Sequence, residues 1–267
     1  MRAPGFRAVL VREIRTSLRT PSTALLAFTY LGLALGVAWY TEAVKGGYLA
    51  VAASLATPTE LVVGVVGFAL GYRVVVADRT TGELDLTRTY GLSASSYVAG
   101  VYFGRLAVVA VVVLTPVVVL AGLVPFYGGP RTTIVAWHGG VDSPLLLARY
   151  GLLSLAYGAS ALAVSVMLSS VSRDHRAALA SVVVAWIGLA LGVDLMVSTG
   201  LSFDVVDESW LAWLTSTSPT TAYRGLVLEY VVGVGIGDVR ATYPVPSLLG
   251  LTAWTVVPLW IAKRSVW

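Results

Sequence analysis

Long stretches without a formal charge are the feature of this sequence that most limits how the chain can fold. A helix that crosses the hydrocarbon core of a bilayer needs about 20 consecutive, mostly apolar residues. Four uncharged stretches of 22 to 25 residues meet this length: Thr20–Thr41, Leu106–Pro130, Tyr150–Ser172 and Ala241–Ala262. Each of them can therefore form one membrane-spanning helix.

The composition places the chain in a bilayer rather than in water. Of its 267 residues, 57% are hydrophobic and only 12% are charged, and the mean hydropathy is +0.82. A soluble domain carries about 25% charged residues, so this chain has too few charges to cover a globule of its size. The absence of cysteine excludes disulfide scaffolds and thiolate chemistry. The net charge of +4 is too small to indicate a nucleic-acid partner, and we expect none.

Two further segments are apolar except for one internal charge each. Glu60–Ala77 contains Arg73 about one turn from its end, where the side chain can reach the lipid headgroups. Ala177–Val197 contains Asp194 near its end. We therefore predict an all-α integral membrane protein with one domain, residues 1–267, and six spans over about 22–40, 59–77, 97–123, 145–171, 177–197 and 246–262.

The distribution of basic residues predicts the orientation of these spans, because cytoplasmic segments of membrane proteins collect Lys and Arg. A cytoplasmic N-terminus puts thirteen basic residues inside: Arg2, Arg7, Arg12, Arg15, Arg19, Arg73, Arg79, Arg88, Arg105, Arg173, Arg176, Lys263 and Arg264. It leaves five outside: Lys45, Arg131, Arg149, Arg224 and Arg240. We therefore expect a multi-pass protein of the cytoplasmic membrane with both termini in the cytoplasm and an extracellular loop over 198–245.

The first 20 residues differ from the predicted spans. Their apolar residues share one broad arc of a helical wheel: Phe6, Val9, Leu10, Ile14 and Leu18. Arg12, Arg15 and Arg19 cluster on the opposite side, a pattern typical of an amphipathic helix that lies in the membrane interface and contacts lipid. The alternative is a solvated basic N-terminus. Pro21 suits the first turn of the helix that follows.

Several motifs of enzymes are missing from the sequence. Neither Lys45 nor Lys263 lies in the Gly-x-x-x-x-Gly-Lys-Ser/Thr motif that cradles ATP phosphates, so any use of ATP requires a partner. The two histidines, His138 and His175, lie alone in separate loops and cannot assemble a metal site. We therefore expect no catalytic residue, no bound metal and no enzymatic activity in this chain.

The most informative stretch is ADRTTGELDLTRTYGLSASSYVAGVYFGR, residues 77–105, between the second and third predicted spans. A turn between antiparallel helices takes about 2–8 residues, and this connection is much longer. Gly91 interrupts it, and Ser93 is placed to cap the helix that follows. Residues 78–96 are therefore predicted to form a short, partly apolar helix rather than an ordinary solvated loop. The apolar residues of this helix are Leu84 and Leu86.

This segment resembles the signature of ABC type-2 transporter permeases. In that family an acidic residue ends the second span, a Gly and leucines form a cytoplasmic coupling helix, and a Ser-led turn opens a third span that contains Gly-Lys-x-x-Gly-Arg. The matching residues are Asp78, Gly82, Leu84, Leu86, Ser93, Gly100, Gly104 and Arg105. The sequence departs from the pattern at Glu83, Tyr90-Gly91 and Val101, where Thr or Ser, a Pro-containing turn and Lys are usual.

Two further stretches are similar to the same family. Residues 11–15, VREIR, resemble its N-terminal elbow helix, and this places Arg12, Glu13 and Arg15 on an interfacial helix. Residues 218–224, SPTTAYR, resemble a motif that precedes its last span. Within the family, the chain is similar to the subgroup associated with maturation of copper enzymes such as nitrous oxide reductase.

The resemblance implies a permease subunit that moves a substrate across the membrane with ATP hydrolysed by a separate cytosolic ATPase. ATP and Mg would then bind to that partner, and this chain would need no cofactor. The resemblance also implies a dimer with a second copy or with a related permease. The residues implied to dock the ATPase are Asp78, Gly82, Glu83, Leu84 and Leu86. The alternative is a stand-alone six-helix channel or secondary transporter, although no inverted repeat relates the two halves of the sequence.

Two charges fall within or beside the predicted spans and need a separate explanation. Arg149 and Asp194 are both expected toward the outer face, and a charge within the membrane is costly enough to indicate a role. We expect these two residues to form a structural ion pair, and the alternative is a substrate site.

Overall fold

The computed structural model describes residues 3–128, 142–192, 218–233 and 243–267, together with a few positions between 195 and 216. Every regular element in these ranges is a helix. In chain order they are α1 (Ala3–Arg19), α2 (Pro21–Tyr40), α3 (Ala43–Gly46), α4 (Tyr48–Gly71), α5 (Val74–Thr80), α6 (Glu83–Thr89), α7 (Ala94–Tyr127), α8 (Pro144–Val171), α9 (His175–Ile187) with the π-helical η1 (Gly188–Gly192), α12 (Pro219–Val227) with the π-helical η2 (Leu228–Val232), and α13 (Pro244–Ser265).

Six helices in the described part of the chain are long and apolar enough to cross a membrane. They cover Pro21–Tyr40, Tyr48–Thr80, Ala94–Tyr127, Pro144–Val171, His175–Gly192 and Pro244–Ser265. The predicted fold class, an all-α membrane protein with six spans, is therefore confirmed.

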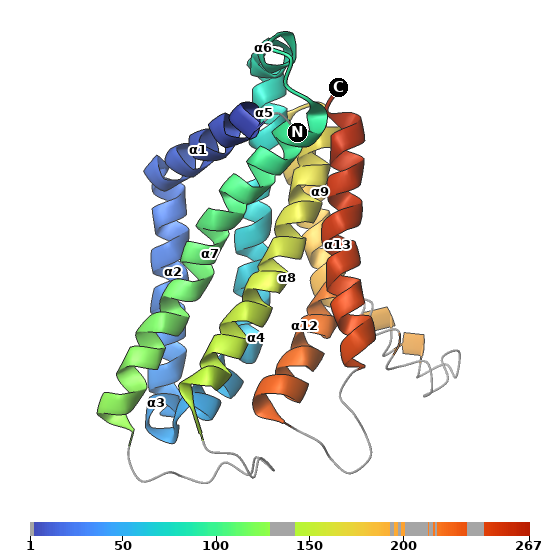
Figure 1. Cartoon of the computed structure of the whole chain (residues 1–267). Coiled ribbons are helices and arrows are strands. Elements are labelled where there is room, and N and C mark those ends of the chain that lie inside the picture. Colours follow the sequence, from blue (N-terminus) through green and yellow to red (C-terminus); the bar gives the residue numbers. More distant parts are fainter. Residues whose placement is uncertain are drawn as a thin grey trace.

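Figure 1 shows these helices running alongside one another as a bundle. Both chain termini and α6 lie at one end of the bundle, which we call the α6 end, and α3 lies at the opposite end, the α3 end (Figure 1). Helix α1 lies across the α6 end at an angle to α2 (Figure 1). Pro21 occupies the first turn of α2, as predicted, so the chain changes direction at Thr20.

The second span begins at Tyr48, about three turns before the predicted start near residue 59. Pro58 lies inside this helix, and a membrane helix tolerates an internal proline where neighbouring groups satisfy the freed backbone atoms. The carboxylate of Asp142 accepts hydrogen bonds from the backbone N–H groups of Tyr48 and Leu49, at 3.0 and 2.9 Å, and so caps the start of α4.

Helix α8 packs against α4, α7, α12 and α13 and forms the centre of the bundle. The backbones of α4 and α8 approach closely where α4 carries glycine. A Cβ atom added to Gly67 would lie 2.8 Å from the Cβ of Ala161 and 3.0 Å from the carbonyl oxygen of Gly158. One turn further, a Cβ on Gly71 would lie 2.7 Å from the Cβ of Ser165. Small residues therefore allow the close packing that holds membrane helices together.

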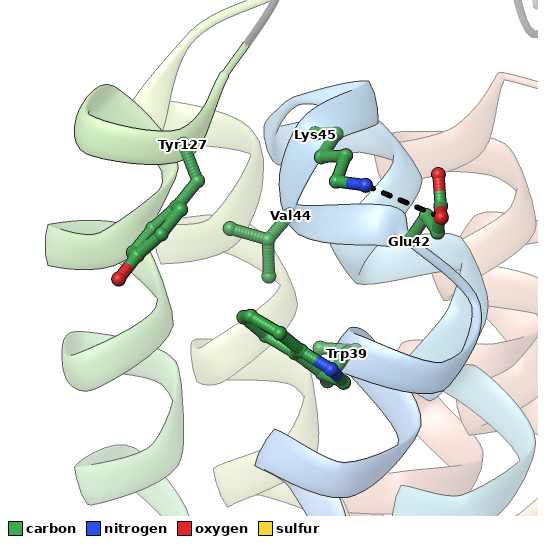
Figure 2. A pocket seen from close by; sticks show the side chains of 6 residues that line it. Trp39, Glu42, Val44, Lys45 and Tyr127 are labelled. Atoms are coloured by element: carbon green, nitrogen blue, oxygen red, sulfur yellow. Dashed lines mark ion pairs between the residues drawn. The ribbon is translucent and has the colours of Figure 1, made fainter.

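A hollow of about 280 Å³ opens at the α3 end, where α2, α3 and α7 finish (Figure 2). The rings of Trp39 and Tyr127 meet there edge to face, with centroids 6.2 Å apart. Glu42 and Lys45 form an exposed ion pair with an N–O distance of 3.2 Å. Exposed Trp and Tyr side chains beside charged groups are typical of the boundary between hydrocarbon and lipid headgroups, so the α3 end lies at one membrane surface.

The close approach of α4 to α8 can be tested with Gly67→Ala. We expect this variant to lose about 1–3 kcal/mol of stability, because backbone atoms of α8 stand where the new methyl group would go. Thermal unfolding in detergent measures the loss. Gly36→Ala is the matched control, since no atom lies within 4 Å of its added Cβ and alanine favours a helix. Equal unfolding temperatures for the two variants would contradict the packing argument.

Candidate functional site

The segment between α4 and α7 folds into two short helices. Gly82 has a φ of +76°, a conformation that glycine adopts without strain, and it starts α6. Gly91, with a φ of +73°, follows the end of α6. The hydroxyl of Ser93 then accepts a hydrogen bond of 3.2 Å from the backbone N–H of Ser96 and caps α7. The predicted break at Gly91 and the predicted cap at Ser93 are confirmed.

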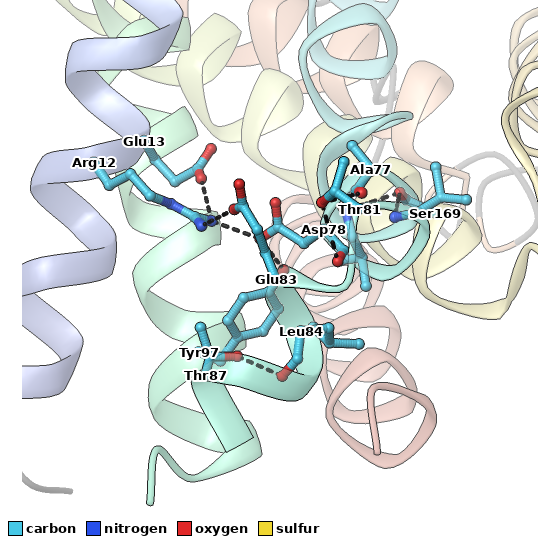
Figure 3. A network of polar contacts seen from close by, with 12 residues as sticks. Arg12, Glu13, Ala77, Asp78, Thr81, Glu83, Leu84, Thr87, Tyr97 and Ser169 are labelled. Atoms are coloured by element: carbon cyan, nitrogen blue, oxygen red, sulfur yellow. Dashed lines mark hydrogen bonds and ion pairs between the residues drawn. The ribbon is translucent and has the colours of Figure 1, made fainter. Parts of the chain in front are cut away.

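An ionic network joins α1 to this segment at the α6 end (Figure 3). The guanidinium of Arg12 donates to Asp78 Oδ2 on α5 at 2.6 Å and to Glu83 Oε2 on α6 at 2.9 Å. It also donates to its neighbour Glu13, at 2.8 Å. The same oxygen of Asp78 accepts a hydrogen bond of 2.7 Å from the hydroxyl of Tyr97 on α7. Arg12 is therefore the residue through which α1, α5 and α6 are joined.

The charge on Arg12 is stabilised by its acidic neighbours. Burial by itself lowers the pKa of the guanidinium, but the hydrogen bond and the charge of Asp78, with the charge of Glu13, raise the pKa of Arg12 above its ordinary value. Asp78 is largely buried whereas Glu83 is exposed. Because solvent weakens exposed ion pairs, the contact with Asp78 contributes more to holding α1 than the contact with Glu83.

Helix α1 sits on α7 at two glycines of the family-like motif. A Cβ added to Gly100 would lie 2.8 Å from the Cβ of Val9, and one added to Gly104 would lie 2.6 Å from the Cβ of Glu13. Arg105, the next residue, donates through Nε to the buried carboxylate of Glu13 at 2.7 Å. The surface of α7 formed by Gly100, Gly104 and Arg105, which we call the seat of α1, is thus where α1 packs.

A cleft of about 750 Å³ lies beside this network, between the α1–α2 corner and the junction of α4 with α5. Its walls include the charged groups of Arg12, Asp78 and Arg105 and the apolar side chains of Leu25 and Leu26. Helix α1 packs directly on α7. Its contact with α5 and α6 in this region is made by the polar side chain of Arg12.

The two leucines of α6 lie in different environments. Leu84 is 5% exposed and belongs to the hydrophobic core of the bundle. Leu86 is 58% exposed. The family resemblance implies a docking role for both, and in the structure Leu86 is at the surface whereas Leu84 packs onto the chain itself. Glu83 is exposed and Gly82 is partly exposed, whereas the carboxylate of Asp78 accepts hydrogen bonds from Arg12 and Tyr97.

Arg79 is a connecting residue that the sequence analysis missed. Its guanidinium donates to the backbone carbonyl oxygens of Ser170 at 2.7 Å, Ser172 at 2.9 Å and Ser265 at 3.0 Å. The hydroxyl of Ser169 accepts hydrogen bonds from the backbone at the start of α5. Helix α5 is therefore tied to the ends of α8 and α13, through backbone acceptors that no side-chain pattern reveals.

A second polar site lies within the bundle, where α12 packs against α4, α8 and α13. Glu60, halfway along α4, accepts two hydrogen bonds from Arg224 on α12, at 2.9 and 2.8 Å. The residues on both sides of Arg224 in α12 are buried. The sequence predicts 198–245 as an outer loop; within that range Pro219–Val227 form a helix with mostly buried side chains, the large Tyr223 and Leu226 included.

Tyrosine and threonine hydroxyls surround this ion pair. Thr59 forms hydrogen bonds with the hydroxyls of Tyr30, at 3.0 Å, and Tyr150. The hydroxyl of Tyr223 lies 3.0 Å from that of Ser154. A further tyrosine, Tyr157, stacks on Tyr223 with ring centroids 5.1 Å apart. These contacts join α2, α4, α8 and α12 by buried polar groups.

Two other predicted sites have different outcomes. Arg149 is exposed on α8, and Asp194 lies outside the described residues, so their ion pair stays a prediction. His138 also lies outside the described residues, and His175 opens α9 beside Thr80. Within the described ranges, no group of three or more His, Asp or Glu side chains is placed to hold a metal ion.

Comparison with known proteins identifies the family. A family model described as "ABC-2 family transporter protein" matches residues 40–263. The chain belongs to this family. It is 27% identical over 262 residues to the "Probable ABC transporter permease protein NosY" of Pseudomonas aeruginosa, covering 93% of this chain and 90% of that relative. It is 25% identical over 268 residues to the protein of the same name from Stutzerimonas stutzeri, covering 94% of each chain.

These matches confirm the family resemblance carried by the sequence motifs. The chain is a multi-pass protein of the cell membrane and a permease subunit of an ABC transporter. Membership in the family implies an ABC transporter system with an ATPase partner. The matches favour this assignment over the stand-alone channel or secondary transporter.

The seat of α1 on α7 can be tested with Gly104→Ala. The added methyl group would meet Glu13 and the carbonyl oxygen of Leu10, at 3.0 Å, so we expect α1 to detach in part from α7. Limited trypsin digestion after the exposed residues Arg15 and Arg19 reports this detachment as faster cleavage. Gly122→Ala, in the same helix with no atom within 4 Å, is the control. Cleavage at one rate in both variants would show that Gly104 does not seat α1.

Proposed function

We propose that this permease places the α6 end in the cytoplasm and there docks a separate ATPase through α6. The missing nucleotide-binding motif supports a separate ATPase, since neither lysine of the chain has the required context. The exposed apolar side chain of Leu86 on a short helix outside the spans supports docking at α6. ATP and Mg would bind to the partner, and this chain would contribute no cofactor site.

The basic residues of the described chain support this orientation. Arg12, Arg79 and Arg105 belong to the contacts at the α6 end, and Lys263 and Arg264 close α13 beside the C-terminus. Among the residues expected outside, Arg224 is paired with Glu60 of α4.

Movement of α6 would reach the spans by two routes. The first runs through Glu83, Arg12 and Asp78 to α1, which is seated on α7. The second runs through α5 and Arg79 to the ends of α8 and α13. Both routes consist of charge-assisted hydrogen bonds and close backbone packing, which transmit displacement better than a flexible loop. A second copy, or a related permease, would complete the transport path by dimerising with this chain.

Docking through α6 can be tested with Leu86→Asp. Burial of a leucine at an interface contributes roughly 1.5–3 kcal/mol, so we expect the variant to bind the ATPase at least about tenfold more weakly. Co-purification of the ATPase in mild detergent measures the effect. Thr41→Asp adds the same charge at the α3 end and should retain the partner. Equal retention by both variants would exclude α6 as the docking helix.

The orientation can be tested with single cysteines in this cysteine-free chain. Thr41 and Thr89 are exposed at opposite ends of the bundle. In intact cells, a membrane-impermeant maleimide should label Thr41→Cys but not Thr89→Cys, because the bilayer separates the reagent from the α6 end. Permeabilised cells should label both. The reverse pattern in intact cells would invert the topology.

A further inference from the structure

The ion pair between Glu60 and Arg224 lies where charges are expensive. Glu60 is 3% exposed, and its position halfway along the 24-residue α4 puts it near the middle of the membrane. An ionisable residue at that depth is costly and indicates a role, with the partner as part of it. Both oxygens of Glu60 are engaged by the Nε and Nη2 atoms of Arg224, the two-point geometry of a strong arginine–carboxylate contact.

The two partners differ in how freely they can move. Glu60 belongs to α4, which is packed along its length against α8. Arg224 belongs to the nine-residue α12, and its side chain is 41% exposed. The arginine is therefore the partner that can withdraw toward an accessible space, whereas the carboxylate stays within the bundle.

Polar contacts also hold the rest of α12. Tyr223 contacts α8 through Ser154 and Tyr157, and Thr220 donates through Oγ1 to the carbonyl oxygen of Leu189 on η1 at 2.8 Å. A helix of nine residues is too short to cross a bilayer or to be stable alone. Helix α12 therefore depends on these side chains to stay within the bundle.

We propose that Glu60 and Arg224 form a latch that keeps α12 in place between α4 and α8. In this position α12 keeps water away from the residues that it covers. Glu60 is the fixed half of the latch and Arg224 is the movable half, and both act as positioning residues for transport. The proposal goes beyond docking of the ATPase at α6 and does not depend on it. Loss of the latch lets α12 leave its seat and admits water to the residues that α12 covers.

The test uses a single reporter thiol, Ser218→Cys, at the start of α12. Ser218 is 4% exposed, and the exchange replaces one oxygen by sulfur in a chain without other thiols. The labelling rate with a water-soluble maleimide in purified, reconstituted protein then reports how often α12 opens. We expect Glu60→Gln to label at least about tenfold faster than the protein with the native pair, because the two charge-assisted contacts between Glu60 and Arg224 are lost.

Three further variants separate a latch from a general loss of structure. Glu42→Gln removes the exposed pair with Lys45 at the α3 end and should label at the native rate. Glu60→Gln combined with Arg224→Gln removes both charges of this pair together, so it should fold, elute as the native protein does, and still label fast. Arg224→Lys keeps the charges but loses the two-point contact, so its rate should lie between the others. Native labelling rates in the double variant and in Arg224→Lys would overturn the latch.

Discussion

The membrane provides little hydrophobic force between helices, and most features of this structure follow from that constraint. Lipid chains are as apolar as the side chains that they contact, so helices associate where backbones come close and where polar groups find partners. Gly67 and Gly71 bring α4 against α8, and Gly100 and Gly104 bring α7 against α1. Each glycine surface is accompanied by a polar contact nearby. Ser165 donates to the Phe68 carbonyl oxygen at 2.8 Å, and Arg105 pairs with Glu13.

The same constraint explains why charged residues occur in two places with different consequences. At the α6 end, Arg12 contacts three carboxylates beside a cleft, and its contact with the exposed Glu83 is weaker than its contacts with the largely buried Asp78 and Glu13. Within the bundle, the buried carboxylate of Glu60 accepts two hydrogen bonds from Arg224, and taking the charged partner away from a buried carboxylate is costly. The first arrangement suits a joint between moving helices, and the second suits a position that opens rarely.

The sequence predicts those features that depend on local rules. Six spans follow from long apolar stretches with no internal charge or a single one, and the break at Gly91 and the cap at Ser93 follow from backbone preferences. Contacts between distant segments do not follow, because a one-dimensional pattern does not say which helices meet. Arg79 bonds to backbone carbonyl oxygens, which every residue has, and Leu84 differs from Leu86 only by the face of a two-turn helix. The sequence predicts that the second span begins next to Glu60, whereas in the structure the helix begins at Tyr48 and Glu60 lies halfway along it.

The motif residues near Arg224 show how a local pattern and a distant partner combine. Ser218 and Pro219 open α12 as a helix start would, so the motif describes the element correctly. Tyr223 and Arg224 then point to different helices, α8 and α4, because adjacent residues on a helix lie about 100° apart. One short helix can thus contact two spans at once. Displacement of α8 relative to α4 must therefore strain the contact of Tyr223 or the contact of Arg224. Because Ser169 and Arg79 join α8 to α5, a movement of α5 is linked through α8 to the position of α12.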